Sequence, residues 1–222
     1  MIRKVRFLLK HIQRRIRKAF ITKYGMEYYN NFCEQSGRKL EELLPQVPNI
    51  GKSIFEMNYY FIICYFAWFD TFKRMGQTSE KAAQGVWFIN EEYFKSWPKF
   101  VMHFAGAVLY SGSQRKHAAV AAEKSAKGEL PPFDWKIRYI NIDKNTYRLD
   151  SYECAALKLG KLIGMEDIFP AICRMDYLCS HYFGNEFRRK GTLADGFDCC
   201  DSWFRFPGTT QWPVPMDIEG KK

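Results

Sequence analysis

The 222-residue sequence predicts an α+β fold, with an N-terminal helical half followed by a ββααββ unit that has a four-stranded antiparallel sheet and helices packed on one face. Three observations predict it. Apolar residues recur at helical spacing up to about residue 127, the period changes to two after Trp135, and a second pair of alternating segments follows two further helices. With 47% hydrophobic and 26% charged residues, the composition is that of a globular chain with a real core.

Residues 1–25 are predicted to form a basic amphipathic helix. One face carries its apolar residues at spacings of three and four: Ile2, Val5, Leu9, Ile12, Ile16 and Ala19. Residues 1–23 hold nine Lys or Arg and no acid, which leaves 25 basic against 24 acidic residues elsewhere, so nine of the ten net positive charges belong to this segment. The helix can dock on the rest of the chain or a second subunit, lie on an anionic membrane, or bind nucleic acid. Docking is favoured, and no nucleic-acid partner is expected, because a basic face beside an apolar stripe is more typical of docking.

The helical half continues with residues 26–44, and an aromatic helix from Ser53 to about Met75 is apolar on every side and therefore expected in the core. Ser79 is expected to cap the next helix, and the helical pattern persists to Gly128. No apolar run reaches the ~20 residues of a membrane-spanning helix. Because there is no signal-peptide pattern and the seven cysteines are an odd number, we expect reduced thiols in the cytoplasm.

The second half contains the predicted sheet. Its elements are strands at 135–140 and 146–150, helices at 154–163 and 169–183, and strands at 186–193 and 200–206. Pro170 is expected at the first turn of the second helix, and Asp195-Gly196 marks the loop between the last two strands. The predicted division is therefore the basic helix 1–25, a single α+β domain 26–206, and an irregular tail 207–222.

Two side chains of the helix 169–183 suggest chemistry. Cys173 and Asp176 lie three residues apart, with Ser180 four further on, so all three share one face. A thiol beside a carboxylate suits a nucleophile with a proton-handling partner. The alternative is a buried cysteine that acts as a small hydrophobe beside an exposed aspartate.

The last strand pair adds further candidates. Arg188 projects from one face of its strand and Arg189 from the other, and an arginine that faces a pocket binds a carboxylate through two parallel hydrogen bonds. The alternative is a solvated strand edge. Cys199 and Cys200 face opposite ways, so only one of them can share a face with Cys154. No C-x-x-C pair and no histidine at ligand spacing accompanies them, so a metal is not expected.

Together these residues resemble the L-2-amino-thiazoline-4-carboxylic acid hydrolase family. The likeness covers roughly residues 45–206 and rests, in chain order, on Val47-Pro48-x-Ile50-Gly51, Cys154 at the head of a helix, Cys173-x-x-Asp176, Arg188-x-x-x-Thr192-Leu193-Ala194-x-Gly196, Cys200-Asp201 and Phe204-Arg205-Phe206. The doubled Cys199-Cys200 and the bulky Ser202-Trp203 depart from the family pattern. The second half is similar, more distantly, to 4-vinyl-reductase-type ligand-binding domains, although Arg189 and Thr192 replace an acid and a cysteine there.

The resemblance implies a hydrolase that opens a cyclic amidine, 2-amino-thiazoline-4-carboxylate, to N-carbamoyl-cysteine in bacterial cysteine metabolism. It points to Cys173, Asp176, Cys200 and Asp201 as catalytic groups, either as a thiol nucleophile or as a carboxylate that activates water. It also implies that Cys154, Arg188 and Thr192 bind the substrate, with Arg188 on its carboxylate. No cofactor is expected, and the expected partner is a small-molecule substrate. Two alternatives stay open beside it: docking of residues 1–23 on a membrane or a subunit, and assembly with a second copy of the chain. The alternative is a non-catalytic small-molecule binding or sensing domain of the same fold.

Overall fold

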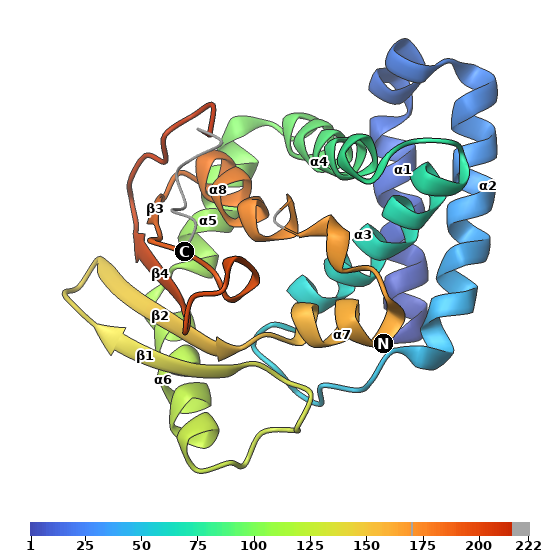
Figure 1. The fold of residues 1–222 in the computed structure, drawn as a ribbon. Coiled ribbons are helices and arrows are strands. Elements are labelled where there is room, and N and C mark those ends of the chain that lie inside the picture. The colour runs from blue at the N-terminus through green and yellow to red at the C-terminus, as the bar shows by residue number, and fades with distance from the viewer. Residues whose placement is uncertain (170, 215–222) are drawn as a thin grey trace. The chain divides into compact units, whose positions relative to one another are not determined.

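The computed structural model describes residues 1–169 and 171–214 and confirms the predicted α+β fold (Figure 1). The chain forms two compact units, each made of segments that are separate in the sequence. The first unit comprises Met1–Pro48, Glu56–Ser96 and Ala156–Ile172, and the second comprises Asn49–Phe55, Trp97–Ala155 and the chain from Cys173 onward. Pro170 and residues 215–222 of the predicted tail 207–222 lie outside the described residues, and the predicted division at residues 25 and 206 stays a prediction.

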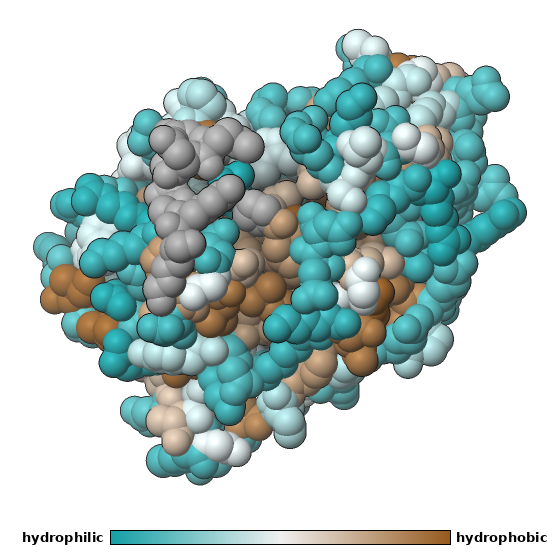
Figure 2. All heavy atoms as spheres, viewed as in Figure 1, coloured by the Kyte–Doolittle hydropathy of each residue, from teal (hydrophilic) through white to brown (hydrophobic). Residues whose placement is uncertain are grey.

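The first unit is a helical bundle. Its elements are α1 (Ile2–Tyr24), α2 (Met26–Leu43), the short η1 (Leu44–Gln46), α3 (Glu56–Arg74), α4 (Ser79–Lys95), most of α7 (Ala155–Ile163) and η2 (Glu166–Ile168). Helix α3 buries residues on all sides, among them the fully buried Trp68, as its pattern predicts. The outer side of α2 is mostly hydrophilic (Figure 2).

The apolar face of α1 packs on the chain itself. Val5, Leu9, Ile12 and Ile16 are all buried, and α1 contacts α2, α3 and α4. This is the interpretation favoured by the sequence. Docking of α1 on a second subunit stays a prediction, and its apolar face is already covered within this unit.

The start of α4 differs from the prediction by one residue. Thr78, and not Ser79, is the N-cap, since its hydroxyl oxygen accepts a hydrogen bond from the Lys81 backbone N–H at 3.3 Å. The Ser79 hydroxyl instead donates to Asp167 Oδ2 of η2 at 2.7 Å. Thr78 therefore caps α4, and the adjacent Ser79 links α4 to η2.

The second unit contains an antiparallel sheet in the order β1-β2-β4-β3. The elements of this unit are α5 (Lys99–Leu109), α6 (Gly112–Ala126), β1 (Lys136–Asn141), β2 (Thr146–Glu153), most of α8 (Ala171–Phe183), β3 (Glu186–Arg188), η3 (Leu193–Asp195) and β4 (Cys200–Arg205). One side of the sheet, which we call the helix-facing side, carries rings that meet the helices. Tyr110 at the end of α5 lies 5.8 Å from the Phe204 ring of β4, and Tyr177 of α8 lies 4.6 Å from the Phe187 ring of β3.

Strand β3 is shorter than the predicted strand 186–193. After Arg188 the backbone leaves the sheet because the Lys190 N–H, at 2.9 Å, and the Gly191 N–H donate to the Asp201 carboxylate and not to a neighbouring strand. Thr192 then caps η3. Among the described residues, no helix combines the length and the hydropathy needed to cross a bilayer.

Candidate functional site

A buried arginine ties the end of β3 to one turn of α8. Arg189 Nη1 lies 2.8 Å from Asp176 Oδ2, and Arg189 Nη2 donates to the Cys173 carbonyl oxygen at 2.6 Å. Its side chain is only 2% exposed. Arg189 therefore fixes the turn of α8 that carries the two candidate side chains, through hydrogen bonds that are strong because they involve charged groups.

Asp176 is a carboxyl group in an environment of low polarity that solvent still reaches. The surrounding protein raises the pKa of Asp176 above its usual range, and the charge and hydrogen bond of Arg189 oppose that rise. Its side chain nevertheless stays 44% exposed. A carboxyl group of this kind can take up and release a proton closer to neutral pH than an ordinary aspartate.

Several thiols lie near this carboxyl group, and the charge of Asp176 acts on Cys173, Cys179 and Cys200. Cys154 and Cys200 both influence the pKa of Cys173, and burial raises that pKa well above its ordinary value. Burial likewise raises the pKa of Cys200 to about 12, although the Leu193 N–H donates to its sulfur at 3.2 Å. Both thiols therefore stay protonated at neutral pH.

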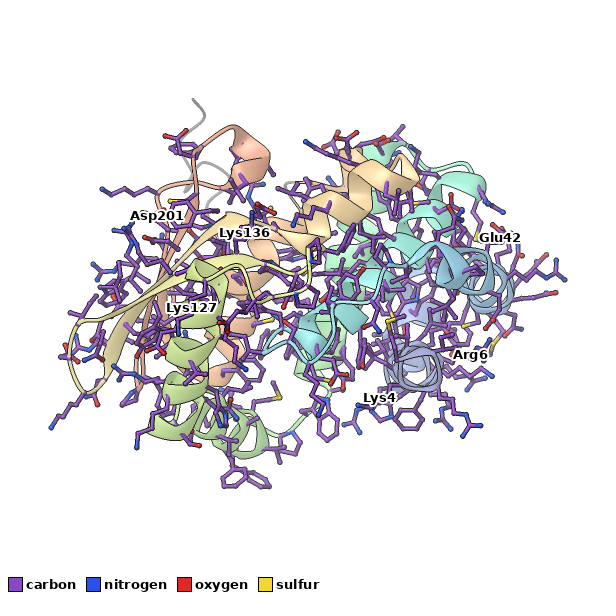
Figure 3. The ribbon with its side chains drawn as sticks, turned by 90° about the horizontal axis from the view of Figure 1, so that it is seen from below. Lys4, Arg6, Glu42, Lys127, Lys136 and Asp201 are labelled. Carbon is purple, nitrogen blue, oxygen red and sulfur yellow. The ribbon has the colours of Figure 1, made fainter. Side chains whose placement is uncertain are left out.

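The alternation of β4 separates two candidate pairs. Cys200 lies on the helix-facing side of the sheet with Phe204, whereas Cys199 and Asp201 lie on the opposite side, where both interact with Arg148. Asp201 is labelled in Figure 3. Its carboxylate already accepts the loop N–H groups that end β3, so the structure does not bring Asp201 together with Cys173 and Asp176.

Arg188 and Thr192 are also held elsewhere. The Arg188 side chain is 72% exposed, pairs with Glu186 and lies over the Trp203 ring at 5.2 Å, on the side of the sheet opposite Arg189. Thr192 is fully buried, and its hydroxyl donates to Asp195 Oδ2 at 2.7 Å and accepts from the Asp195 N–H at 3.2 Å. Thr192 thus shapes the loop before β4.

The candidate site consists of Cys154, Cys173, Asp176, Arg189 and Cys200. The first three and the last were among the site residues predicted from the sequence, whereas Arg189 was given no role in the site. The signal that identifies it is Phe187. This apolar residue must face the helices, and strand alternation then places Arg189 on the same side.

Within residues 1–169 and 171–214, no group of three His, Cys, Asp or Glu side chains is arranged to hold a metal ion. The thiols of the candidate site are accompanied by an arginine, whose positive charge disfavours a cation at this place.

A family model described as L-2-amino-thiazoline-4-carboxylic acid hydrolase matches residues 55–204. No curated protein and no solved structure matches the chain. The matched region spans more than half of the sequence, includes the whole sheet except the end of β4, and contains every residue of the candidate site. The chain therefore belongs to the L-2-amino-thiazoline-4-carboxylic acid hydrolase family.

Proposed function

We propose that this chain hydrolyses a small cyclic amidine, with 2-amino-thiazoline-4-carboxylate as the first substrate to test, and that Asp176 activates the attacking water. The observation that carries the proposal is the state of Asp176, whose pKa is raised by its surroundings, whose position is fixed by Arg189 and whose side chain remains accessible. These are the properties that a general base requires.

The proposed reaction consumes one water. The Asp176 carboxylate takes a proton from the water while the water oxygen bonds to the ring carbon that lies between nitrogen and sulfur. The electron pair of the C=N bond moves onto the ring nitrogen. The protonated Asp176 then passes this proton to that nitrogen. When the carbon–sulfur bond breaks, the remaining hydroxyl proton goes to the sulfur, which leaves as a thiol. The product is N-carbamoyl-cysteine.

The cysteines line the site in this proposal and do not attack. A thiol becomes a good nucleophile when its surroundings lower its pKa, and here burial raises the pKa of both Cys173 and Cys200. Arg189 is a positioning residue, because both ends of its guanidinium are already bound to α8. Arg188 lies on the opposite side of the sheet, so we do not assign the substrate carboxylate to it.

The test is turnover by the purified full-length chain, followed by thiol release and by mass spectrometry of N-carbamoyl-cysteine. Asp176→Asn should lower kcat by about 10²-fold or more, the usual contribution of a general base. Cys173→Ser should keep kcat within about tenfold, since a hydroxyl replaces a thiol that does not attack. Cys199→Ser is a matched control on the opposite side of the sheet and should retain full activity.

Three results would contradict parts of the proposal. If the wild-type chain shows no turnover while a known hydrolase assayed alongside is active, the substrate is wrong. If it also binds that compound saturably in calorimetry, the alternative of a binding domain replaces the enzyme. If Asp176→Asn stays active while Cys173→Ser is inactive, the attacking group is the thiol.

A further inference from the structure

The outer face of α1 carries an unbroken row of positive charge. Arg3, Arg6, Lys10, Arg14 and Arg17 follow one another at spacings of three and four residues, so they line one side of the helix over about 21 Å. All five are exposed. We call this row the basic stripe. Figure 3 views α1 nearly end-on, and the labelled Arg6 projects outward from it.

Most of this charge is not neutralised within the unit. Arg6 is paired with Glu41 of α2, its Nε donating to Oε1 at 2.7 Å. Arg3, Lys10 and Arg14 form no ion pair with any residue in the described part of the chain. The sequence itself places no acidic residue in the first 23 positions. The basic stripe is therefore a surface with a net positive charge that attracts anionic partners.

An aromatic side chain and a depression accompany the charges. Phe7 lies between Arg3 and Lys10 on the same side of α1, and it is 64% exposed. Beside it is a depression of about 500 Å³, lined by Arg6, Phe7, Lys10, Gln13 and Arg14 of α1 and by Tyr29 and Cys33 of α2. Cationic walls around a space of this size suit an anionic headgroup, since Lys and Arg donate charge-assisted hydrogen bonds to phosphate.

We propose that the basic stripe of α1 docks the protein on a membrane surface rich in anionic phospholipid, with a headgroup phosphate in the depression and Phe7 in the interfacial layer. This differs from an ordinary amphipathic anchor, in which the apolar face enters the lipid. Here the apolar face is buried against α2, α3 and α4, so the helix is held flat with its charged side outward. A membrane is favoured over single-stranded nucleic acid because one exposed ring does not form the row of stacking rings that such binders use.

Vesicle flotation of the full-length chain tests this proposal. We expect binding to phosphatidylcholine vesicles that contain phosphatidylserine, loss of binding as salt rises, and little binding to phosphatidylcholine alone. Reversal of the three unpaired charges, in Arg3→Glu, Lys10→Glu and Arg14→Glu combined, should lower the partition coefficient by more than about 100-fold, because loss of three basic residues at roughly fivefold each already gives that factor and the new carboxylates are repelled by the surface. Phe7→Ala should lower it several-fold without changing its salt dependence.

The matched control reverses three exposed lysines of the second unit, in Lys99→Glu, Lys116→Glu and Lys127→Glu combined, and so has the same net charge. It should bind as well as the wild type if the stripe is the docking surface. Circular dichroism and the unfolding midpoint should show that both triple variants are folded. If the variant with Arg3→Glu, Lys10→Glu and Arg14→Glu is unfolded, the partition coefficient is measured on a variant in which the same three residues are changed to Gln.

Four outcomes would overturn the proposal. They are equal binding to vesicles with and without phosphatidylserine, equal loss in both triple variants, displacement from vesicles by millimolar-scale inorganic phosphate alone, and tighter binding to a single-stranded oligonucleotide than to the anionic vesicles. The third would show a site for free phosphate, and the fourth a nucleic-acid surface. None of them bears on hydrolysis, because the stripe and the candidate site belong to different units.

Discussion

Replacing Arg189 by Gln should weaken the fold and change the protonation of Asp176, whereas replacing its neighbour Arg188 by Gln should do neither. Arg189 is 2% exposed and binds the Asp176 carboxylate and the Cys173 carbonyl oxygen, while Arg188 is 72% exposed on the other side of the sheet. The two substitutions remove the same charge from adjacent positions. Any difference between them therefore reports on the contacts with α8.

The size of the effect on stability can be estimated from these contacts. A hydrogen bond to a charged group contributes about 1.5–3 kcal/mol when buried, which we assign to the Cys173 carbonyl. The Asp176 carboxylate is 44% exposed, so solvent screens that pair and we count about 1 kcal/mol for it. Arg189→Gln should thus lower the free energy of unfolding by about 2.5–4 kcal/mol. Arg188→Gln loses an exposed pair with Glu186 and should cost about 1 kcal/mol or less.

The direction in which the pKa of Asp176 changes follows from the positive charge of Arg189. Arg189 lowers the pKa of Asp176, opposing the rise caused by burial, so its removal should raise that pKa further. If Asp176 is the general base, activity falls on acidification as the carboxylate takes up a proton. The acid limb of the pH–rate profile should therefore move to higher pH in Arg189→Gln and stay in place in Arg188→Gln.

Urea unfolding and the pH dependence of kcat/KM measure the two effects separately. The carbon-13 signal of the Asp176 carboxyl gives its titration directly, even in a variant with little activity. Equal stability losses in the two variants, or an unchanged Asp176 titration in Arg189→Gln, would refute the role that we assign to Arg189.

Three further predictions concern packing and ionisation. A methyl group at Gly106 would lie 2.2 Å from the carbonyl oxygen of Phe183, so Gly106→Ala should lower the free energy of unfolding by about 3 kcal/mol in urea titrations, whereas Gly112→Ala, which meets open space, should not. The pKa of Asp167 is lowered to about 2 by its partners on α3 and α4; stability from this carboxylate is therefore present above its ordinary pKa of 3.8 and is lost as the pH falls through about 2. Asp167→Asn should cost about 1 kcal/mol or less above that range, since 47% of the side chain is exposed, and nothing well below pH 2. Because the pKa of Cys200 is about 12, iodoacetamide should alkylate it at neutral pH at least about 100-fold more slowly in the native chain than in urea, as followed by peptide mass spectrometry.

The fold was predictable because hydrophobic periodicity reports directly on burial. The apolar face of α1 from Val5 to Ile16 and the continuous apolar surface of α3 both correspond to buried residues. The predicted end of a strand was wrong where a distant side chain, and not the local sequence, ends the strand. The predicted strand after Glu186 continues to residue 193 by composition, but the Asp201 carboxylate draws the chain away after Arg188. A carboxylate eleven residues further along the sequence leaves no periodic signal.

The candidate site was predictable on the helix and less so on the strands. Cys173 and Asp176 lie three residues apart on a helix, and this spacing alone places them on one face. On a strand, adjacent residues face opposite sides of the sheet, so a candidate that is assigned one position too early or too late lies on the wrong side. Cys200 lies on the side that meets the helices, whereas Arg188 and Asp201 lie on the other, although all three follow the family-like order.

The same alternation bears on how the site is built. Phe187 and Phe204 pack against each other at 5.0 Å on the helix-facing side, so the hydrophobic core fixes the register of β3 against β4. A slip of β3 by one residue would carry the Phe187 ring to the opposite side of the sheet while β4 stays paired with β2, and it would also exchange Arg189 for a neighbour with no access to α8. The energy of core packing thus sets which arginine reaches Asp176. A substitution such as Phe187→Ser should therefore disturb the protonation of Asp176 as well as the stability of the sheet, because one strand register supports both.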